Sequence, residues 1–182
     1  MKKLVLIISL FSALVLPPAQ ADLYAELGFE GGGDEIIGTN TGDEISAGGG
    51  IKLSLGIQNP VSANNMASIR LSVGYLFDSI DAANGDADFE TLTFDAMYIT
   101  NYGRHSLGVG ATVHMSPEYK DDIVGFAPLN LEFDDAVGVV LQYGYHLQPG
   151  FEIGARVSSI DYEVGATSID GGSVGIYLSN GF

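Results

Sequence analysis

Eight stretches of the chain alternate apolar residues with small or polar ones at a period of two. In one of them, Leu71, Val73 and Tyr75 alternate with Ser72 and Gly74. The stretches are 23–30, 47–58, 67–78, 91–100, 106–116, 136–146, 151–159 and 173–182. Strict alternation over about ten residues is typical of a half-buried β-strand, and a tilted strand of that length crosses a bilayer. The pattern therefore predicts an all-β chain.

The polar face of these stretches and the connections between them favour a barrel over a soluble β-sandwich. The polar face carries mostly Gly, Ser and Thr, as expected for a narrow, crowded lumen. The connections alternate long and short, at 31–44, 59–65, 78–88, 101–105, 116–128, 147–150 and 161–172. Outer-membrane barrels have long extracellular loops and short periplasmic turns. We therefore predict a closed eight-stranded antiparallel up-and-down transmembrane β-barrel.

The N-terminal segment has the pattern of a secretory signal peptide. Lys2 and Lys3 precede an apolar run over 4–16, and Ala19-Gln20-Ala21 forms a small-x-small cleavage site. We expect a cleaved signal peptide over 1–21 and a barrel domain over 22–182. This arrangement predicts export to the cell outer membrane.

Aromatic residues cluster near the ends of the predicted strands, as they do in the interfacial girdles of membrane barrels. The predicted loop-side girdle is Phe29, Tyr75, Phe77, Phe94 and Phe133. The predicted turn-side girdle is Tyr98, Tyr143, Tyr145, Phe151 and Phe182.

The chain closes on an alternating apolar stretch with a terminal aromatic residue. A closed barrel pairs its last strand with its first, because unsatisfied backbone cannot face lipid. Val174, Ile176, Leu178 and Phe182 resemble the C-terminal assembly signal of Gram-negative outer-membrane proteins, from which Asn180 departs. That resemblance implies recognition by the barrel-assembly machinery during biogenesis.

Across the mature chain, these features resemble the small eight-stranded outer-membrane barrels: the OmpA transmembrane domain, OmpX, OmpW and the opacity proteins. The resemblance implies a monomer that contacts outer-membrane lipid and lipopolysaccharide, without cofactor or enzymatic activity. Its function would be structural or a surface interaction. An alternative is a narrow channel or small-hydrophobe conduit of the OmpW kind.

A set of charged and amide side chains is predicted to point into the lumen. Burying either sign of charge alone is costly, so we expect these residues to pair in a structural network, although a polar path for ions is an alternative. The set is Glu26, Lys52, Arg70, Asp95, Gln142, Glu152 and Arg156. A solute-passing porin is not expected, because porins need sixteen or more strands.

His114 and Ser116 are the strongest enzymatic candidates. On a regular strand they share a face, so the histidine could activate the hydroxyl. They resemble the His-x-Ser pair of the lipid A deacylase PagL, which makes a lipid A-modifying enzyme the second alternative. Val113 and Met115 are predicted to face lipid, which places His114 and Ser116 in the lumen.

The predicted mature chain is strongly acidic, with 23 Asp and Glu residues against Lys52, Arg70, Arg104, Lys120 and Arg156. This balance argues against nucleic acid as a partner. Most acids lie in the predicted long loops, which could bind divalent cations, and residues 81–90 weakly resemble a calcium loop. The chain has no cysteine, so disulfide, thiolate and zinc-thiolate sites are excluded.

Overall fold

A computed structural model of the chain describes residues 22–38, 44–62, 66–82, 85–122 and 129–182, and it is built from β-strands. The strands are β1 (Asp22–Gly31), β2 (Glu35–Gly38), β3 (Glu44–Ser46), β4 (Gly50–Pro60), β5 (Ala67–Ala82), β6 (Gly85–Tyr102), β7 (His105–Asp121), β8 (Leu129–Glu132), β9 (Ala136–Gln148), β10 (Phe151–Ser159), β11 (Asp161–Val164), β12 (Thr167–Asp170) and β13 (Ser173–Gly181). In the part of the chain that is described, no helix is both long and apolar enough to cross a membrane.

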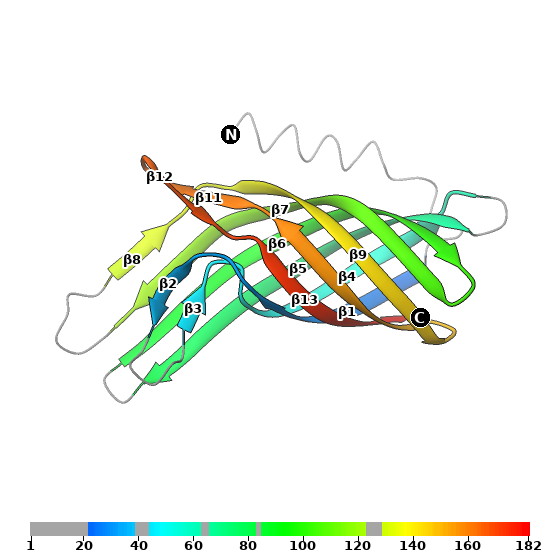
Figure 1. Cartoon of the computed structure of the whole chain (residues 1–182), viewed down its shortest axis with the longest axis horizontal. Coiled ribbons are helices and arrows are strands. Elements are labelled where there is room, and N and C mark those ends of the chain that lie inside the picture. The colour runs from blue at the N-terminus through cyan, green and yellow to red at the C-terminus, as the bar shows by residue number, and fades with distance from the viewer. Residues whose placement is uncertain (1–21, 39–43, 63–65, 83–84, 123–128) are drawn as a thin grey trace.

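Eight of these strands close into an antiparallel barrel, which confirms the predicted fold (Figure 1). Neighbouring strands follow the order β6-β5-β4-β1-β13-β10-β9-β7, and β6 also pairs with β7 to complete the ring. The last strand pairs with the first from Tyr24 opposite Gly181 to Gly31 opposite Val174. The terminal stretch therefore seals the wall, so every barrel strand has two hydrogen-bonded neighbours.

The exterior of the barrel is apolar and its interior is polar, the reverse of a soluble protein. Leu55, Val137 and Ile176 on the outer face are at least 60% exposed, whereas Lys52, Asp95 and Arg156 on the inner face are at most 5% exposed. A continuous apolar belt of this kind would be unstable in water and is the surface that hydrocarbon covers. The period-two pattern thus separates a lipid-facing wall from a filled lumen.

At the loop end, short hairpins extend the barrel wall (Figure 1). The predicted loop over 78–88 instead continues the ladder of β5 and β6 up to the pair Ala82–Gly85. β2 pairs with β3, β11 with β12, and β8 with the upper part of β7.

A second, apolar core lies inside these loop-end extensions. The inward-facing side chains change there from polar to apolar, and Phe89, Tyr119 and Tyr162 are almost completely buried. The loop-end core comprises Ile45, Ala47, Leu76, Ala87, Phe89, Tyr119, Phe133, Ala136, Ile160 and Tyr162. The extensions are therefore packed structure that closes the barrel above its polar lumen.

Phe133 belongs to this core, so its assignment to the loop-side girdle was wrong. It is 6% exposed, and its ring centroid lies 6.4 Å from that of Phe89 and 5.9 Å from that of Tyr162. The segment between β8 and β9 turns the ring inward, since the backbone N–H of Phe133 donates to the Pro117 carbonyl. The loop-side residues Phe29 and Tyr75 do face outward and are exposed.

Candidate functional site

The structure places all seven predicted lumen residues inside the barrel, where they are buried and lie close enough to interact. Each comes from an inward position of its strand, so six different strands contribute. They are Glu26 on β1, Lys52 on β4, Arg70 on β5, Asp95 on β6, Gln142 on β9, and Glu152 and Arg156 on β10.

Arg156 is the centre of one half of this lumen network. Its Nη2 lies 2.7 Å from Glu26 Oε1 and donates to Gln142 Oε1 at 3.0 Å. Its Nη1 lies 3.4 Å from Asp95 Oδ2, which also accepts from Lys52 Nζ at 2.9 Å. Two cations and two carboxylates thus compensate one another across the barrel, as charges removed from water require.

Glu152 organises the other half, nearer the turn end. Its Oε1 accepts from Arg70 Nη1 at 3.4 Å and from the Tyr177 hydroxyl at 3.0 Å. Its Oε2 accepts from the Ser106 hydroxyl at 2.6 Å and lies 3.4 Å from His146 Nε2. Arg70 Nη1 also lies 4.0 Å from Glu26 Oε2, which joins the two halves into one network.

Glycines on the inner face leave room for these large side chains. A Cβ at Gly144 would come within 2.5 Å of the Glu152 carboxyl carbon, and one at Gly154 within 2.4 Å of the Tyr177 ring. Atoms cannot approach this closely, so the network and the small residues of adjacent strands depend on one another. This complementarity explains why the inner face is rich in glycine.

Several network members were not among the predicted lumen residues. Gln58 accepts from Arg70 Nε at 3.0 Å and from Nη2 at 2.8 Å, and Arg70 stacks over the Tyr24 ring at 4.7 Å. Glu30 lies 3.9 Å from Arg156 Nη1. All three occupy inward positions of the alternating pattern, so strand parity is the signal that could have found them.

The network nearly fills the lumen at its own level of the barrel. Its seven predicted members have exposed fractions between 2 and 5%, so a water-sized probe barely reaches them. Above them, the loop-end core fills the interior with apolar side chains. Side chains therefore fill most of the interior in these described layers, as expected for an eight-stranded barrel.

His114 and Ser116 lie on opposite sides of the wall, so the prediction that both face the lumen was wrong for Ser116. His114 is buried, with Nδ1 2.6 Å from the Tyr162 hydroxyl, whereas Ser116 is exposed. The register of β6 and β7 shifts here, and Ser116 has a φ of 48°. This β-bulge reverses the side-chain parity of β7. The histidine therefore cannot activate that hydroxyl in this arrangement.

The loop-end surface is acidic. Among the described acids, all except Asp22, Glu26, Asp95 and Glu152 lie toward the loop end. Lys120 is exposed there and lies 2.8 Å from Glu118 and 3.4 Å from Glu90. Within the described part of the chain, no group of three or more Asp, Glu or His side chains has metal-binding geometry. Divalent-cation binding by the loops thus stays a prediction.

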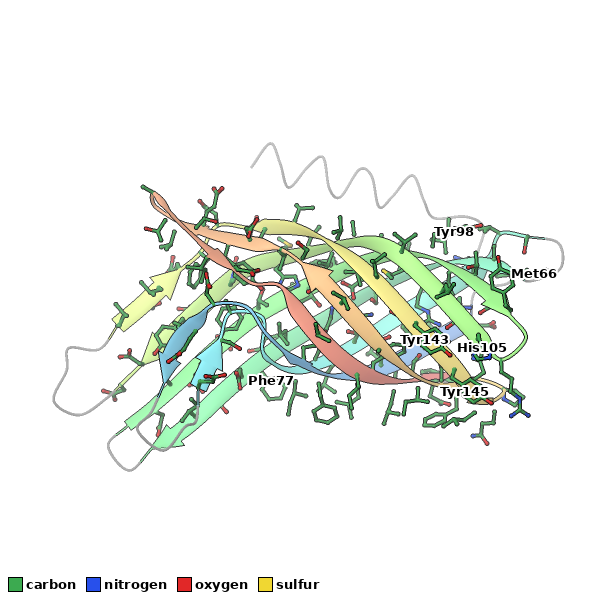
Figure 2. All side chains as sticks on the ribbon, in the orientation of Figure 1. Met66, Phe77, Tyr98, His105, Tyr143 and Tyr145 are labelled. Atoms are coloured by element: carbon green, nitrogen blue, oxygen red, sulfur yellow. The ribbon has the colours of Figure 1, made fainter. Side chains whose placement is uncertain are left out.

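Aromatic residues lie near both ends of the apolar belt. Figure 2 shows Tyr98, His105, Tyr143 and Tyr145 near the turn end and Phe77 toward the loop end. Tyr75 stacks on Phe77 with ring centroids 6.0 Å apart, and its hydroxyl donates to Glu90. These rings mark the two levels at which apolar wall gives way to polar groups.

Known proteins resemble this chain in fold, but the sequence comparisons find no significant match. No protein-family model matches the chain, and no curated protein matches it in sequence at a significant level. Among solved structures, the attachment invasion locus protein Ail of Yersinia pestis, crystallised with the heparin analogue sucrose octasulfate, matches with a TM-score of 0.55 at 12% identity. The match covers 89% of this chain and 97% of that one.

Two further structures match over similar lengths. Neisserial surface protein A gives a TM-score of 0.56 at 12% identity, covering 89% of this chain and 97% of that one. A major outer membrane protein of Thermus thermophilus gives 0.54 at 10% identity, covering 89% and 99%. At these identities the likeness concerns fold. The chain has the fold of the small eight-stranded outer-membrane β-barrels.

Proposed function

We propose that this protein is a non-enzymatic, monomeric outer-membrane barrel that acts by presenting a rigid acidic surface outside the cell. The observation that carries the proposal is the loop-end core, which packs the hairpin extensions instead of leaving them as mobile loops. Ordering a surface in advance lowers the entropic cost of binding a partner. The closed lumen supports a role in structure or contact in preference to transport.

The negative charge of this surface favours a positively charged partner. Ail was crystallised with a sulfated sugar, but an anionic ligand of that type does not suit the loop end of this chain. Here Glu118 lies on β7, Asp134 and Asp135 lie between β8 and β9, and Lys120 is already paired with carboxylates. We therefore expect basic proteins, or divalent cations bridging to lipopolysaccharide phosphates, to bind more readily than polyanions.

The C-terminal residues retain their proposed role in assembly. Val174, Ile176, Leu178 and Phe182 share the outward face of the last strand and its end, where they are exposed. Before the barrel closes, β13 is an unpaired edge, and this apolar row is available to the barrel-assembly machinery. The row would face outer-membrane lipid after closure.

Epitope insertion tests the proposed location and orientation. An epitope placed between Gly165 and Ala166, in the turn of the β11–β12 hairpin, should be labelled by antibody on intact cells. The same epitope between Gly103 and Arg104, in the β6–β7 turn, should be labelled only after the outer membrane is permeabilised. Unheated electrophoresis confirms that each variant is folded. Labelling of both epitopes on intact cells, or recovery of the protein in osmotic-shock fluid, would contradict the proposal.

The channel alternative makes the opposite prediction in planar bilayers. Because the lumen network and loop-end core fill the interior at their levels, we expect the folded protein to give no steady conductance. A Lys52→Ala, Arg156→Ala double variant removes the two cations that contact Asp95 but leaves the loop-end core in place, so it should give no steady conductance either. Stable unitary conductance of the unmodified protein would favour the channel.

A further inference from the structure

Two apolar grooves lie on the lipid-facing wall, and each reaches the turn-side half of the barrel. The first, the β9 groove, has a volume of about 550 Å³ and crosses β6, β7, β9 and β10. The second, the β1 groove, has about 650 Å³ and crosses the wall on either side of β1. The volumes are similar, but the side chains at their turn-end rims differ.

The β9 groove exists because Ala155 is small. Strand register sets it beside Tyr143 on β9, and Tyr143 beside Leu107 on β7. In the next row toward the membrane centre, Val157, Leu141 and Val109 are aligned in the same way. Larger outward-facing side chains surround Ala155 and leave a hollow that can hold an acyl chain.

The turn-end rim of the β9 groove carries hydrogen-bond donors and a cation. One row below Tyr143, register places His105 between Tyr102 and Tyr145. His105 Nδ1 lies 2.7 Å from the Tyr143 hydroxyl, and its ring centroid lies 5.3 Å from that of Tyr145. These contacts fix the His105 ring beside Tyr143 and Tyr145 and leave Nε2 as its other polar atom (Figure 2). The preceding residue, Arg104, is exposed in the β6–β7 turn.

We propose that the β9 groove and this rim together bind one anionic phospholipid of the turn-side leaflet. An acyl chain would lie over Ala155, and Arg104 with His105 would hold the phosphate at the level of the tyrosine girdle. Guanidinium and imidazole groups form charge-assisted hydrogen bonds to phosphate, and tyrosine hydroxyls at the interface add further donors. The inference rests on the proposed membrane location, since only then does the groove meet lipid.

The β1 groove supplies an internal control. It is built around Ala25, and its turn-end edge holds Asn180 and Phe151. Neither groove has a Lys, Arg or His among its lining residues, so the difference lies beyond the edge of the β9 groove, where Arg104 and His105 follow the β6–β7 turn. Acyl chains can fill both hollows, but Arg104 and His105 lie beside the turn-end edge of the β9 groove. A selective site should therefore respond to changes at Ala155 and not to the matched change at Ala25.

Native mass spectrometry of the protein in detergent micelles tests the inference with dioleoylphosphatidylglycerol as the probe. We expect one lipid to be retained, in preference to phosphatidylethanolamine and to dioleoylglycerol. An R104Q/H105Q variant should weaken retention about tenfold because two charge-assisted contacts are lost. A155L should weaken it by filling the hollow, whereas A25L should leave it unchanged.

Several results would overturn the inference. One is an equal loss of lipid retention in A155L and A25L. Another is retention of dioleoylglycerol as strong as that of phosphatidylglycerol. A third is displacement of the bound lipid by millimolar inorganic phosphate. Each variant is first checked for heat-modifiable migration. A chain that never gives the folded form in micelles would refute the proposed membrane function, whereas a folded chain without selective lipid would refute this inference alone.

Discussion

Replacing Arg156 with methionine should lower the free energy of unfolding by about 3–5 kcal/mol, the usual cost of removing one partner of a buried ion pair. Arg156 lies 2.7 Å from Glu26 and 3.4 Å from Asp95, and both carboxylates are buried. Methionine fills part of the space but leaves Glu26 with only the 4.0 Å contact to Arg70. Urea unfolding in lipid vesicles, followed by unheated electrophoresis, measures the change.

Lys120→Met is the matched control. Lys120 also contacts two carboxylates, at 2.8 and 3.4 Å, but its side chain is 47% exposed. Water screens exposed pairs, so they contribute little to stability, and this variant should lose far less than Arg156→Met. Equal losses in the two variants would show that the lumen network contributes no more than a surface pair. A double variant of Arg156→Met with Glu26→Gln should recover part of the loss, because the remaining charges then pair as Lys52 with Asp95 and Arg70 with Glu152.

The strands and their faces could be predicted because one physical rule governs the whole wall. Lipid outside and a crowded lumen inside impose a period of two, so Val73 and Tyr75 identify the exposed apolar row of β5. The same alternation predicted that the side chains of Glu26, Lys52 and Arg156 all face the lumen. The individual pairs could not be predicted, because they depend on the stagger of strands that are far apart in sequence.

The rule failed where the backbone departs from a regular strand. Ser116 was assigned to the lumen by counting from His114, but Pro117 cannot donate a ladder hydrogen bond, and a bulge reverses the count. A proline inside an alternating run was the available signal.

The loop-end core was missed for a different reason. Acids at 78–88 have the composition of a loop, but Asp86 and Asp88 face outward while Ala87 and Phe89 face inward. The alternation therefore continues through the acidic segment. The acidic composition of such a hairpin reflects its solvent-facing side chains. Its buried face is recognised from the apolar residues at alternate positions.

Replacing Phe89 with alanine should destabilise the loop-end core by about 3–5 kcal/mol, as is usual when a buried aromatic ring is removed and leaves a cavity. Phe89 is fully buried, and its ring centroid lies 5.8 Å from that of Tyr162 and 6.4 Å from that of Phe133. The hairpins depend on this core, so the variant should be cut rapidly by protease at the loop end. The transmembrane wall should persist, because its strands are held by the ladder and the lumen network.

Phe77→Ala tests whether burial is the cause. Phe77 lies on the neighbouring strand β5, where register pairs it with Glu90, and its ring stacks on Tyr75 at 6.0 Å outside the core. We expect a loss of about 1 kcal/mol and little change in proteolysis. If Phe89→Ala and Phe77→Ala are cleaved at the same rate while both remain heat-modifiable, the hairpins are held by something other than their apolar interior. The acidic surface would then be a set of mobile loops. The proposal that this surface is already ordered before a partner binds would be wrong.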